Sequence, residues 1–578
     1  MKKHGKKVMA CGLAAAMLLG TGGALAAQSQ VQGDRNCDVK VTVDGKKVEL
    51  KDVKGNPVDP IIVDGTTYLP VRAVSEANGL KVNWDAGGSE VKLVTKDAAA
   101  PVKLAEKVNK STQPRIIITT DLEVDDINGV LLSLMYATDY DLAGIVWTAG
   151  MFHFNGDGEH TLAEVTPNYK CEATTAGGTV ENAGQLTSFR PVDPGLLTRL
   201  IEVNYASDYQ YLSKNDPNYP TPEYLLSIAK TGNIAFEGDY RFETEGSELI
   251  EACILDDDPR PLYIMHWGGI NTTVRALMSI YEDYHNTDQW EAVLAKVVDK
   301  VRFIGSGEDN CRADSRIDEL FPGLKDSEWT GFGNYGQYFS AAQASEDLLP
   351  YYQGEYLTEA FKFGHGQLMG AFHLMNDGQV LYGEPLIYQY GLLNYVDWGG
   401  AGKEGWGPQA LSSFPRVELD QFDWMCCQFG CGSFIDIGLR QGVKNSNNHY
   451  VQVLFDELAA RADWAVCAPE DCNHAPVVSA DKPDCTAKAG ETVTLSGCAT
   501  DPDSDKLNVS WWVPGNACTY QDGEATGLEV SVTDTWSAQF TVPRDAESGD
   551  IFVVNMEVTD EAERPMTRFA QFIITVTK

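Results

Sequence analysis

The chain has 578 residues, too many for a single hydrophobic core and enough for about three or four domains. Its formal net charge of −38 repels phosphate backbones and anionic lipids, so a nucleic-acid partner is not expected. This excess of carboxylates suits a protein that binds cations, above all calcium. A hydrophobic content of 43% is typical of globular proteins and argues against disorder.

The N-terminal segment has the pattern of a secretory signal peptide. Lysines at positions 2, 3, 6 and 7 precede an apolar run over residues 8–19, and small residues follow at 24–27. We expect residues 1–27 to be removed and the mature protein to be secreted and extracellular, in solution or associated with the cell surface. The rest of the chain has no run of 18 apolar residues, so membrane insertion is not expected.

Twelve cysteines remain after this segment, and an even number in an exported chain favours disulfides. The spacings Cys427-x3-Cys431 and Cys467-x4-Cys472 are poor matches to a zinc cluster. Disulfide bonds are the preferred interpretation, and their pairing stays open.

Residues 38–98 predict a small α+β domain. Two Asp-Gly turns lie between β-branched runs, a short helix over 71–77 ends at Gly79, and two further strands follow. Residues 68–85 resemble the N-terminal stalk domain of copper amine oxidases. Because residues 38–98 contain no His, Met or Cys, the resemblance implies a spacer or surface-attachment module rather than a copper site. A linker of Ala, Lys and Ser is expected over 99–113.

Residues 114–466 alternate between strand and helix patterns. An apolar strand over 115–121 ends in polar residues, an amphipathic helix covers 125–136, and a second strand begins at Leu142. The pattern recurs as a strand over 261–267, a Gly-Gly turn, a helix from Asn271 and a strand from Val301. This order predicts an α/β domain with an open parallel sheet. Short strands at regular spacing over 474–578 predict a C-terminal Ig-like β-sandwich.

Four carboxylates lie where the first strand of the α/β domain ends, at Asp121, Glu123, Asp125 and Asp126. Ligands of open α/β sheets bind at the carboxyl ends of strands, and crowded carboxylates favour a hard cation such as calcium. A charged helix cap is the alternative, and it accounts for one Asp rather than four. The cluster therefore predicts a metal site.

This stretch resembles the nucleoside hydrolase signature D-T-D-P-G-x-D-D. The resemblance implies that Asp121 is both a calcium ligand and the general base, and that Asp126 is a bidentate calcium ligand. It also implies that Asp125 holds sugar hydroxyls, and we assign Glu123 beside it to substrate binding. In such a site a calcium-ordered water attacks an anomeric carbon.

Two further calcium ligands follow from the same resemblance. One is the backbone carbonyl of Trp267, which precedes the turn at 268–269, and the other is Glu384, for which an ordinary loop carboxylate is an equal alternative. Asn271, which follows the turn, is assigned to substrate binding. Gly383 stands where the family places a histidine that protonates the leaving group, so this usual acid is absent.

A closer resemblance covers residues 114–578. The runs at 123–126, 258–263, 267–272, 365–368 and 459–464 are similar to the cellulose-binding, nucleoside-hydrolase-like family. The resemblance implies the same order of domains, with the α/β domain joined to an Ig-like C-terminal domain.

Two histidines, His153 and His365, are candidates for protonating a leaving group, with purely structural hydrogen bonding as the alternative for each. Aromatic residues including Trp147 are expected near the mouth of the site, where sugar rings stack, although core packing also explains them. The turn with Asp501, Asp503 and Asp505 is either a second calcium site or an Asp-rich turn.

The sequence thus favours a secreted, calcium-dependent hydrolase of a glycosyl bond, N- or O-linked, that acts on a carbohydrate or nucleoside-like substrate. The alternative is a non-catalytic protein that binds cellulose or another plant or cell-wall polysaccharide. A purely structural surface protein is a third interpretation, and it leaves the carboxylate cluster unexplained. The absent acid at position 383 favours binding, whereas Asp121 favours catalysis.

Overall fold

The fold was analysed in a computed structural model. It describes residues 34–35, 39–43, 46–50, 57–63, 66–78, 80–85, 90–95, 104, 113, 115–122, 124–150, 153–165, 174–175, 178–179, 185–188, 191–304, 310–326, 356, 358–372, 446–513, 518–523, 525 and 527–578. The chain divides into two compact units, Met1–Asn78 and Gly79–Lys578. The predicted signal peptide lies outside the described residues.

The smaller unit is built from short antiparallel strands and one helix. Its elements are β1 (Asp34–Arg35), β2 (Thr42–Val43), β3 (Lys46–Lys47), β4 (Ile61–Val63), β5 (Thr66–Tyr68) and α1 (Val71–Ala77). The β2–β3 and β4–β5 pairs are the two hairpins that the Asp-Gly turns predict. Hairpin β6 (Leu80–Asp85) and β7 (Glu90–Thr95) belongs to the larger unit, so the division falls inside the segment 38–98.

A six-stranded sheet is the centre of the α/β domain, with the strand order β12-β9-β8-β13-β14-β15. The strands are β8 (Arg115–Thr120), β9 (Asp141–Trp147), β12 (Ala229–Thr231), β13 (Leu262–Trp267), β14 (Val301–Ile304) and β15 (Lys325–Asp326). All five strand pairs are parallel. Every residue of β8, β9 and β13 is buried, as expected for parallel strands covered on both faces.

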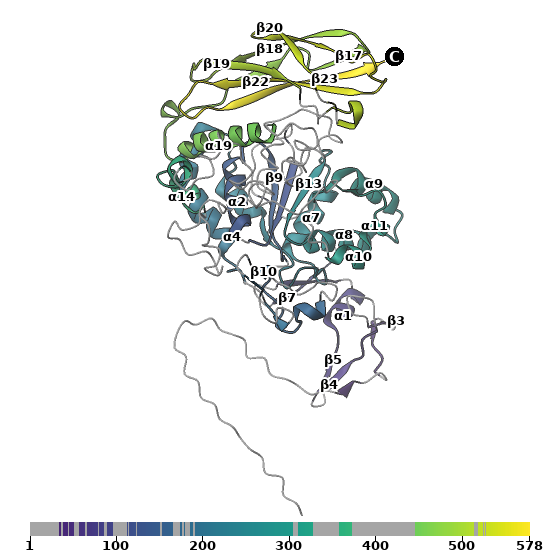
Figure 1. Cartoon of the computed structure of the whole chain (residues 1–578). Helices are drawn as coiled ribbons and strands as arrows, with labels where there is room; N and C mark the ends of the chain where they lie inside the picture. The colour runs from purple at the N-terminus through teal and green to yellow at the C-terminus, as the bar shows by residue number, and fades with distance from the viewer. Residues whose placement is uncertain are drawn as a thin grey trace, which may run out of the picture. The chain divides into compact units, whose positions relative to one another are not determined.

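Helices cover both faces of this sheet (Figure 1). Right-handed crossovers place α2 and α4 to α6 on one face and α7 to α9 on the other. The helices are α2 (Val124–Met135), α3 (Leu162–Val165), α4 (Leu196–Arg199), η3 (Leu200–Tyr205), α5 (Ala206–Asn215), α6 (Pro222–Ile228), α7 (Glu245–Leu255), α8 (Asn271–Tyr284), α9 (Trp290–Lys300), α10 (Asn310–Ser315), α11 (Ile317–Leu320), η5 (Thr358–Lys362), α14 (Gly366–Gly370) and α19 (Ser446–Trp464). A small hairpin, β10 (Thr174–Thr175) and β11 (Gly178–Thr179), lies between α3 and α4 in the chain.

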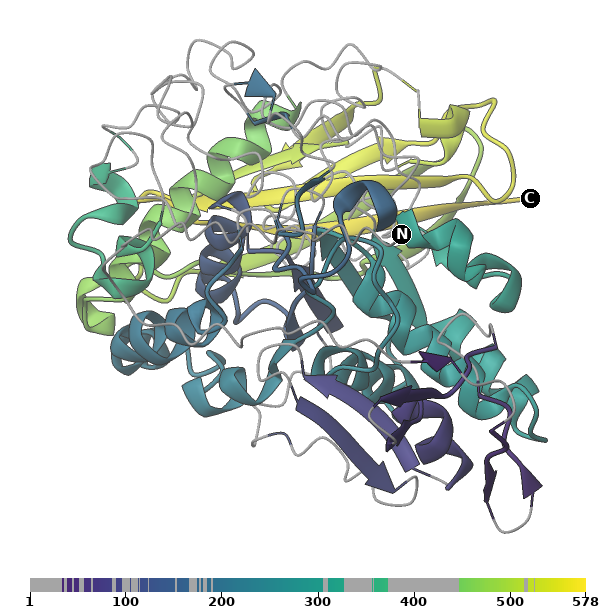
Figure 2. The same ribbon diagram turned by 90° about the horizontal axis from the view of Figure 1, so that it is seen from below.

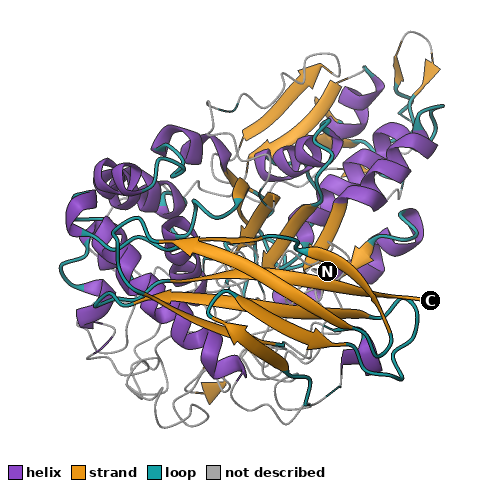
Figure 3. Ribbon diagram, turned by 90° about the horizontal axis from the view of Figure 1, so that it is seen from above, coloured by secondary structure: helices purple, strands orange, loops and turns teal. Residues whose placement is uncertain are grey.

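The C-terminal region is a β-sandwich of two four-stranded sheets, in the orders β16-β18-β21-β20 and β17-β23-β22-β19 (Figure 3). The strands are β16 (Val477–Ala480), β17 (Asp484–Lys488), β18 (Thr492–Thr500), β19 (Leu507–Trp512), β20 (Val530–Asp534), β21 (Ser537–Thr541), β22 (Ile551–Asp560) and β23 (Thr567–Thr577). Short η8 (Pro469–Asp471) and η10 (Tyr520–Gly523) are 3-10 turns. The predicted fold class is confirmed: a parallel α/β domain, a small N-terminal α+β part and a C-terminal sandwich.

Helix α19 joins the sandwich to the α/β domain, and the green helix can be followed against the yellow strands in Figure 2. Glu457 on α19 is fully buried and pairs with Arg461 and with Arg568 of β23, at 2.7 Å in each case. Arg461 also binds Asp139 at 2.6 Å and donates to the carbonyl of Met135 at 3.3 Å. Because Met135 ends α2, this charged junction lies by the amino edge of the sheet, at the end of α2 far from Asp121.

Within the described part of the chain, no helix combines the length and the apolar character that a membrane span requires.

Candidate functional site

The strand order places a topological switch point between β8 and β13. The chain leaves β8 toward β9 on one side and leaves β13 toward β14 on the other. The two strands are paired in register, with Thr120 opposite Trp267 at their carboxyl ends. In open α/β sheets, ligands bind in the crevice at such a point. The residues that follow Thr120 and Trp267 therefore lie at the expected ligand site.

The turn from β8 into α2 brings Asp121 and Asp126 to this edge. Both side chains are buried, with 2% and 4% of their surface exposed. The Thr120 hydroxyl donates to Asp126 Oδ1 at 2.6 Å and accepts from the Leu122 amide at 3.1 Å. Leu122 has a φ of 61°, a left-handed conformation that costs free energy in a non-glycine residue. A tightly held and strained turn thus orients the two carboxylates.

Glycines let β13 approach this turn closely. A Cβ atom on Gly268 would lie 3.0 Å from Asp121 Cβ, and one on Gly129 of α2 would lie 2.9 Å from the ring of Trp267. A side chain at either position would force these groups apart. The Gly-Gly turn predicted next to the acidic cluster is therefore in direct contact with Asp121.

The two predicted tryptophans lie at strand ends with buried rings. The carbonyl of Trp147 accepts a hydrogen bond from the Gly232 amide at 2.7 Å, which links β9 to the end of β12. Both rings are part of the main hydrophobic core. The roles assigned to them, sugar stacking by Trp147 and calcium binding by the Trp267 carbonyl, stay predictions.

Asn271 links three elements at the same edge. Its side-chain amide donates to the carbonyls of Asn233 at 2.7 Å and Asp239 at 3.3 Å, and its Oδ1 accepts from the Thr148 hydroxyl at 3.2 Å. The side chain is fully buried. It holds the loop after β12 against the ends of β9 and β13, whereas its predicted contact with substrate stays a prediction.

The two candidate histidines lie in different places. His153 is buried in the loop after β9, and its carbonyl accepts from the Gly150 amide at 2.8 Å. His365 precedes α14 and contacts Asp463 of α19 at 2.9 Å through Nδ1. Asp463 is two residues from Arg461, which binds the far end of α2. The structure thus brings His153, but not His365, to the edge where Asp121 lies.

The structure describes one of the three remaining predicted site residues, and only its backbone. Glu123 and Glu384 lie outside the described residues, and so does the side chain of Asp125, although its backbone is in the first turn of α2. Their assigned roles in substrate and calcium binding stay predictions.

Sequence reasoning missed the buried carboxyl group of Glu237 at this edge. It lies in the loop between β12 and α7 and is 1% exposed. A Cβ atom on Gly269 would lie 3.0 Å from Glu237 Cγ, so this side chain packs against the Gly-Gly turn. Strand β12 has three residues, Ala-Lys-Thr, with no apolar run to mark it. The acidic residues that follow this short strand are the signal in the sequence that could have revealed Glu237.

Arg241 ties the loops after β9 and β12 together. Its guanidinium binds Asp157 of the first loop and Asp239 of the second, at 2.8 Å in each case. Burial raises the pKa of Asp157, but hydrogen bonds from the His160 amide and from Arg241 outweigh it and hold the pKa well below its usual range. This ionic link fixes the two loops that carry His153 and Glu237.

The described donors at the edge fit a hard cation. Asp121 and Asp126 offer carboxylate oxygens, and the end of β13 offers the carbonyl of Trp267 level with Thr120. Calcium accepts both kinds of oxygen, and sulfur is not needed. The residues present are therefore compatible with the predicted calcium.

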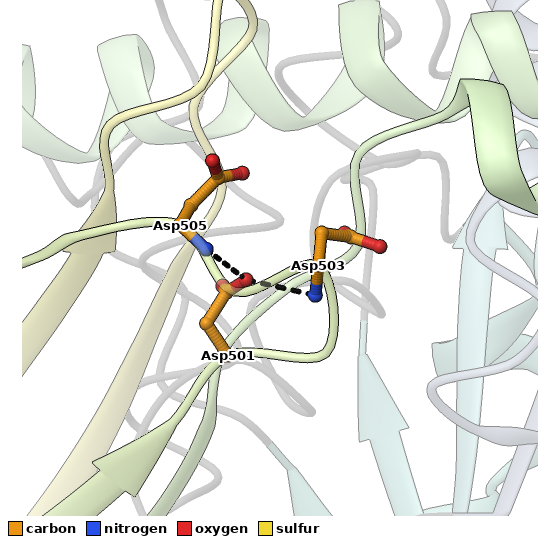
Figure 4. A group of neighbouring side chains, drawn as sticks. All are labelled: Asp501, Asp503 and Asp505. Carbon is orange, nitrogen blue, oxygen red and sulfur yellow. Dashed lines mark hydrogen bonds between the residues drawn. The ribbon is translucent and has the colours of Figure 1, made fainter.

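The carboxylates of Asp501, Asp503 and Asp505 lie within 4.8 Å of one another in the sandwich (Figure 4). Asp501 Oδ1 accepts from the amides of Asp503 and Asp505, both at 2.9 Å. Asp503 in turn accepts from the His474 amide at 2.6 Å. These bonds are those of an Asp-rich turn that ties the sandwich to the segment after α19, and a second calcium there has no further support.

Comparison with family models decides the assignment. Residues 115–403 match the model described as cellulose-binding Sde182, nucleoside hydrolase-like domain. The chain belongs to this family. Residues 492–576 match the C-terminal domain of cellulose-binding protein Sde0182, and residues 34–121 match the copper amine oxidase N-terminal domain. The family and the domain order expected from the sequence are thereby confirmed.

A solved structure shares the fold of the family domain. It is a nucleoside hydrolase-related hypothetical protein from Saccharophagus degradans, described as associated with carbohydrate metabolism. It is 22% identical, with a TM-score of 0.52, over 80% of this chain and 100% of that protein. A search of curated proteins finds no match.

Proposed function

We propose that the protein is a secreted, calcium-dependent hydrolase of a glycosyl bond, N- or O-linked, with its site at the switch point between β8 and β13. One observation carries the proposal: a buried Asp121 follows β8 at this point, packed against Gly268 and close in the chain to the buried Asp126. The nucleoside-hydrolase-like fold of the family supports it.

In this proposal Asp121 takes the proton from the attacking water, because an ionised carboxylate is an acceptor within reach of the edge. Asp126, the Trp267 carbonyl, Glu384 and Asp121 itself would hold calcium. When bound, calcium polarises water and lowers the cost of removing its proton. Asp125 and Glu123 contact sugar hydroxyls, and the Thr120 hydroxyl orients Asp126.

A second candidate function is binding of cellulose or another polysaccharide without catalysis. The name of the matched family model, which describes a cellulose-binding protein, favours it. The same edge would then hold a sugar through its carboxylates, without turnover. The two functions share a ligand class and differ only in whether a bond is broken.

The Asp121→Asn variant separates the two functions. Asn keeps the size of the side chain and one oxygen but cannot take a proton from water at neutral pH, so turnover should fall about 10²–10⁴-fold while sugar binding persists. The assay uses purine and pyrimidine nucleosides, aryl glycosides and cellulose oligomers, with calcium present. Asp193→Asn, which changes an exposed aspartate that pairs with Arg199, is the matched control.

Two results would contradict the hydrolase. One is a wild-type protein that releases no product from any member of the panel yet binds a glycan, which leaves the binding function standing. The other is an Asp121→Asn variant with the turnover of the wild type.

A further inference from the structure

His160 and Arg241 form a polar pair at the carboxyl edge, on the side of the switch point where β9 and β12 lie. His160 belongs to the loop after β9, and Arg241 belongs to the loop after β12. Asp157 joins them, because its Oδ2 atom lies 2.7 Å from His160 Nδ1 and 2.8 Å from Arg241 Nη2. Their side chains are 41% and 21% exposed, so both reach the surface of this edge.

A small apolar cluster supports the pair and connects it to the proposed site. The guanidinium of Arg241 lies 4.9 Å, and the ring centre of His160 lies 6.0 Å, from the centre of the Phe236 ring. Phe236 packs in a buried cluster with Ala149. The Ala149 carbonyl in turn accepts from the Gly269 amide at 3.0 Å. A continuous series of contacts therefore runs from the Gly-Gly turn to the polar pair.

The contacts with Asp157 determine which atoms of the pair can meet a ligand. Burial raises the pKa of Asp157, but hydrogen bonds from the His160 amide and from Arg241 hold it well below its usual range, so this carboxylate is ionised at neutral pH. It can only accept, and His160 Nδ1 therefore carries the hydrogen of their bond. In the part of the chain that the structure describes, His160 Nε2 and Arg241 Nη1 have no hydrogen-bond partner.

A sugar hydroxyl is complementary to these two atoms. A hydroxyl can donate to Nε2 of a neutral imidazole, or accept from it when the ring is protonated, and it can accept from Arg241 Nη1. An anion fits less well, because Asp157 and Asp239 already neutralise Arg241 and the chain carries a net charge of −38. A nucleobase would need an exposed aromatic face for stacking, whereas Phe236 is 7% exposed. The pair thus favours a neutral ligand rich in hydroxyls.

We propose that His160 and Arg241 form a second sugar-binding position, which holds a neighbouring residue of an oligosaccharide while the sugar whose bond is cleaved lies at Asp121. The inference deepens the proposed hydrolase function, on which it rests for the place of the first sugar. It names the substrate class, an oligosaccharide or polysaccharide rather than a nucleoside, because a nucleoside contains a single sugar.

The dependence of affinity on sugar length tests this proposal. Calorimetry with calcium present uses the full chain with Asp121→Asn, so that bound sugars stay intact, and cello-, xylo- and manno-oligosaccharides from monosaccharide to hexasaccharide. For at least one series the affinity should rise with length. Adding His160→Ala should lower the affinity for the longer sugars about 2–10-fold, as expected for one lost hydrogen bond, and leave that for the monosaccharide unchanged.

His285→Ala is the matched control, since it makes the same substitution at the end of α8, where the ring of His285 contacts the Tyr281 carbonyl. It should leave the dependence on length intact. A second measurement needs no change at position 160. Diethyl pyrocarbonate should modify His160 in the free Asp121→Asn chain, and a bound hexasaccharide should protect it but not His285, as mass spectrometry of the digest shows.

The outcomes separate this inference from the hydrolase function. The inference is overturned, and the hydrolase function stands, if affinity does not rise with length in any series, if His160→Ala lowers the affinity for all lengths equally, or if nucleosides bind more tightly than oligosaccharides. Conversely, a wild type that binds the longer sugars through His160 yet cleaves no member of the panel supports the second sugar position and overturns the hydrolase function alone.

Discussion

Buried carboxylates occur at both edges of the parallel sheet, in different surroundings. At the amino edge, Glu457 of α19 lies between two arginines, and Arg461 binds Asp139 as well. At the carboxyl edge, Asp121 and Glu237 pack against the backbone of the Gly-Gly turn, and Asp126 accepts from the Thr120 hydroxyl. The first arrangement joins two domains through opposite charges. The second gathers oxygen donors at the switch point of the sheet.

The surroundings of a buried carboxylate separate those paired with arginines from those that we propose to be functional. Burial alone raises the pKa of Glu457, yet Arg568 and Arg461 outweigh it and lower the pKa below its usual value. The Glu457 carboxylate is thus held in two ion pairs, with Arg461 and Arg568. The carboxylates at the Gly-Gly turn suit a cation and a sugar instead, which is the substance of our proposal. The same acid-to-amide substitution at the two edges should therefore change different properties.

The largest expected effect on stability is that of Glu457→Gln. The amide cannot neutralise Arg461 and Arg568, so the free energy of unfolding should fall by about 3–5 kcal/mol. Chemical denaturation followed by fluorescence measures it, and calcium affinity should stay at the wild-type value. The control is Glu470→Gln, which makes the same substitution at an exposed glutamate in η8, after α19. Its free energy of unfolding should stay within about 0.5 kcal/mol of the wild type.

Acidification gives an independent check of the same pair. The pKa of Glu457 is lowered in the folded state. The stabilisation that ionised Glu457 gives to the folded protein is therefore fully present above its unfolded pKa, and it is lost as the pH falls through its folded pKa. Wild type should lose this part of its stability in acid, and Glu457→Gln should not. Equal acid sensitivity of the two proteins would mean that the junction does not depend on this charge.

A smaller effect is expected from two cysteines beside the junction. Cys467 and Cys472 carry free thiols that are hydrogen-bond neighbours in the segment between α19 and β16. In an oxidising compartment we expect them to form a disulfide by exchange with an oxidised dithiol partner, with a stabilisation of at most about 2 kcal/mol for so short a loop. Mass spectrometry after alkylation, with Cys467→Ser as control, detects the bond. Two alkylated thiols in protein purified from the medium would contradict it.

The smallest expected effect on stability is that of Asp126→Asn at the carboxyl edge. The amide oxygen can still accept from the Thr120 hydroxyl, so the free energy of unfolding without calcium should change by less than about 1 kcal/mol. The same denaturation experiment measures it. A loss of unfolding free energy as large as that in Glu457→Gln would mean that Asp126 at the carboxyl edge stabilises the fold as much as Glu457 does at the amino edge.

The parts of the site that follow directly from strand ends could be predicted from the sequence. Residues 116–118 of β8 are apolar and β-branched, two threonines end the strand, and the carboxylates come directly after it, so a local pattern places Asp121 and Asp126. The Gly-Gly turn after β13 is marked in the same way. Topology then brings these two strand ends together, because β8 and β13 are neighbours in the sheet.

The parts that depend on contacts between distant segments could not be predicted. Glu237 follows a three-residue strand without an apolar run, and its place beside Gly269 depends on how its loop packs. The His365 motif is recognisable, yet its ring pairs with Asp463, 98 positions away in the sequence. Glu457 and Arg568 are 111 positions apart, and no spacing rule connects them.

A calorimetric calcium titration of the full chain, with wild type, Asp126→Ala and Glu457→Gln side by side, tests the proposed calcium site at the carboxyl edge most directly. We expect one tight site in wild type, a sharply weakened site in Asp126→Ala because a carboxylate ligand is lost, and an unchanged site in Glu457→Gln. Calcium binding that is the same in Asp126→Ala as in wild type would contradict the assignment of the metal to the carboxyl edge.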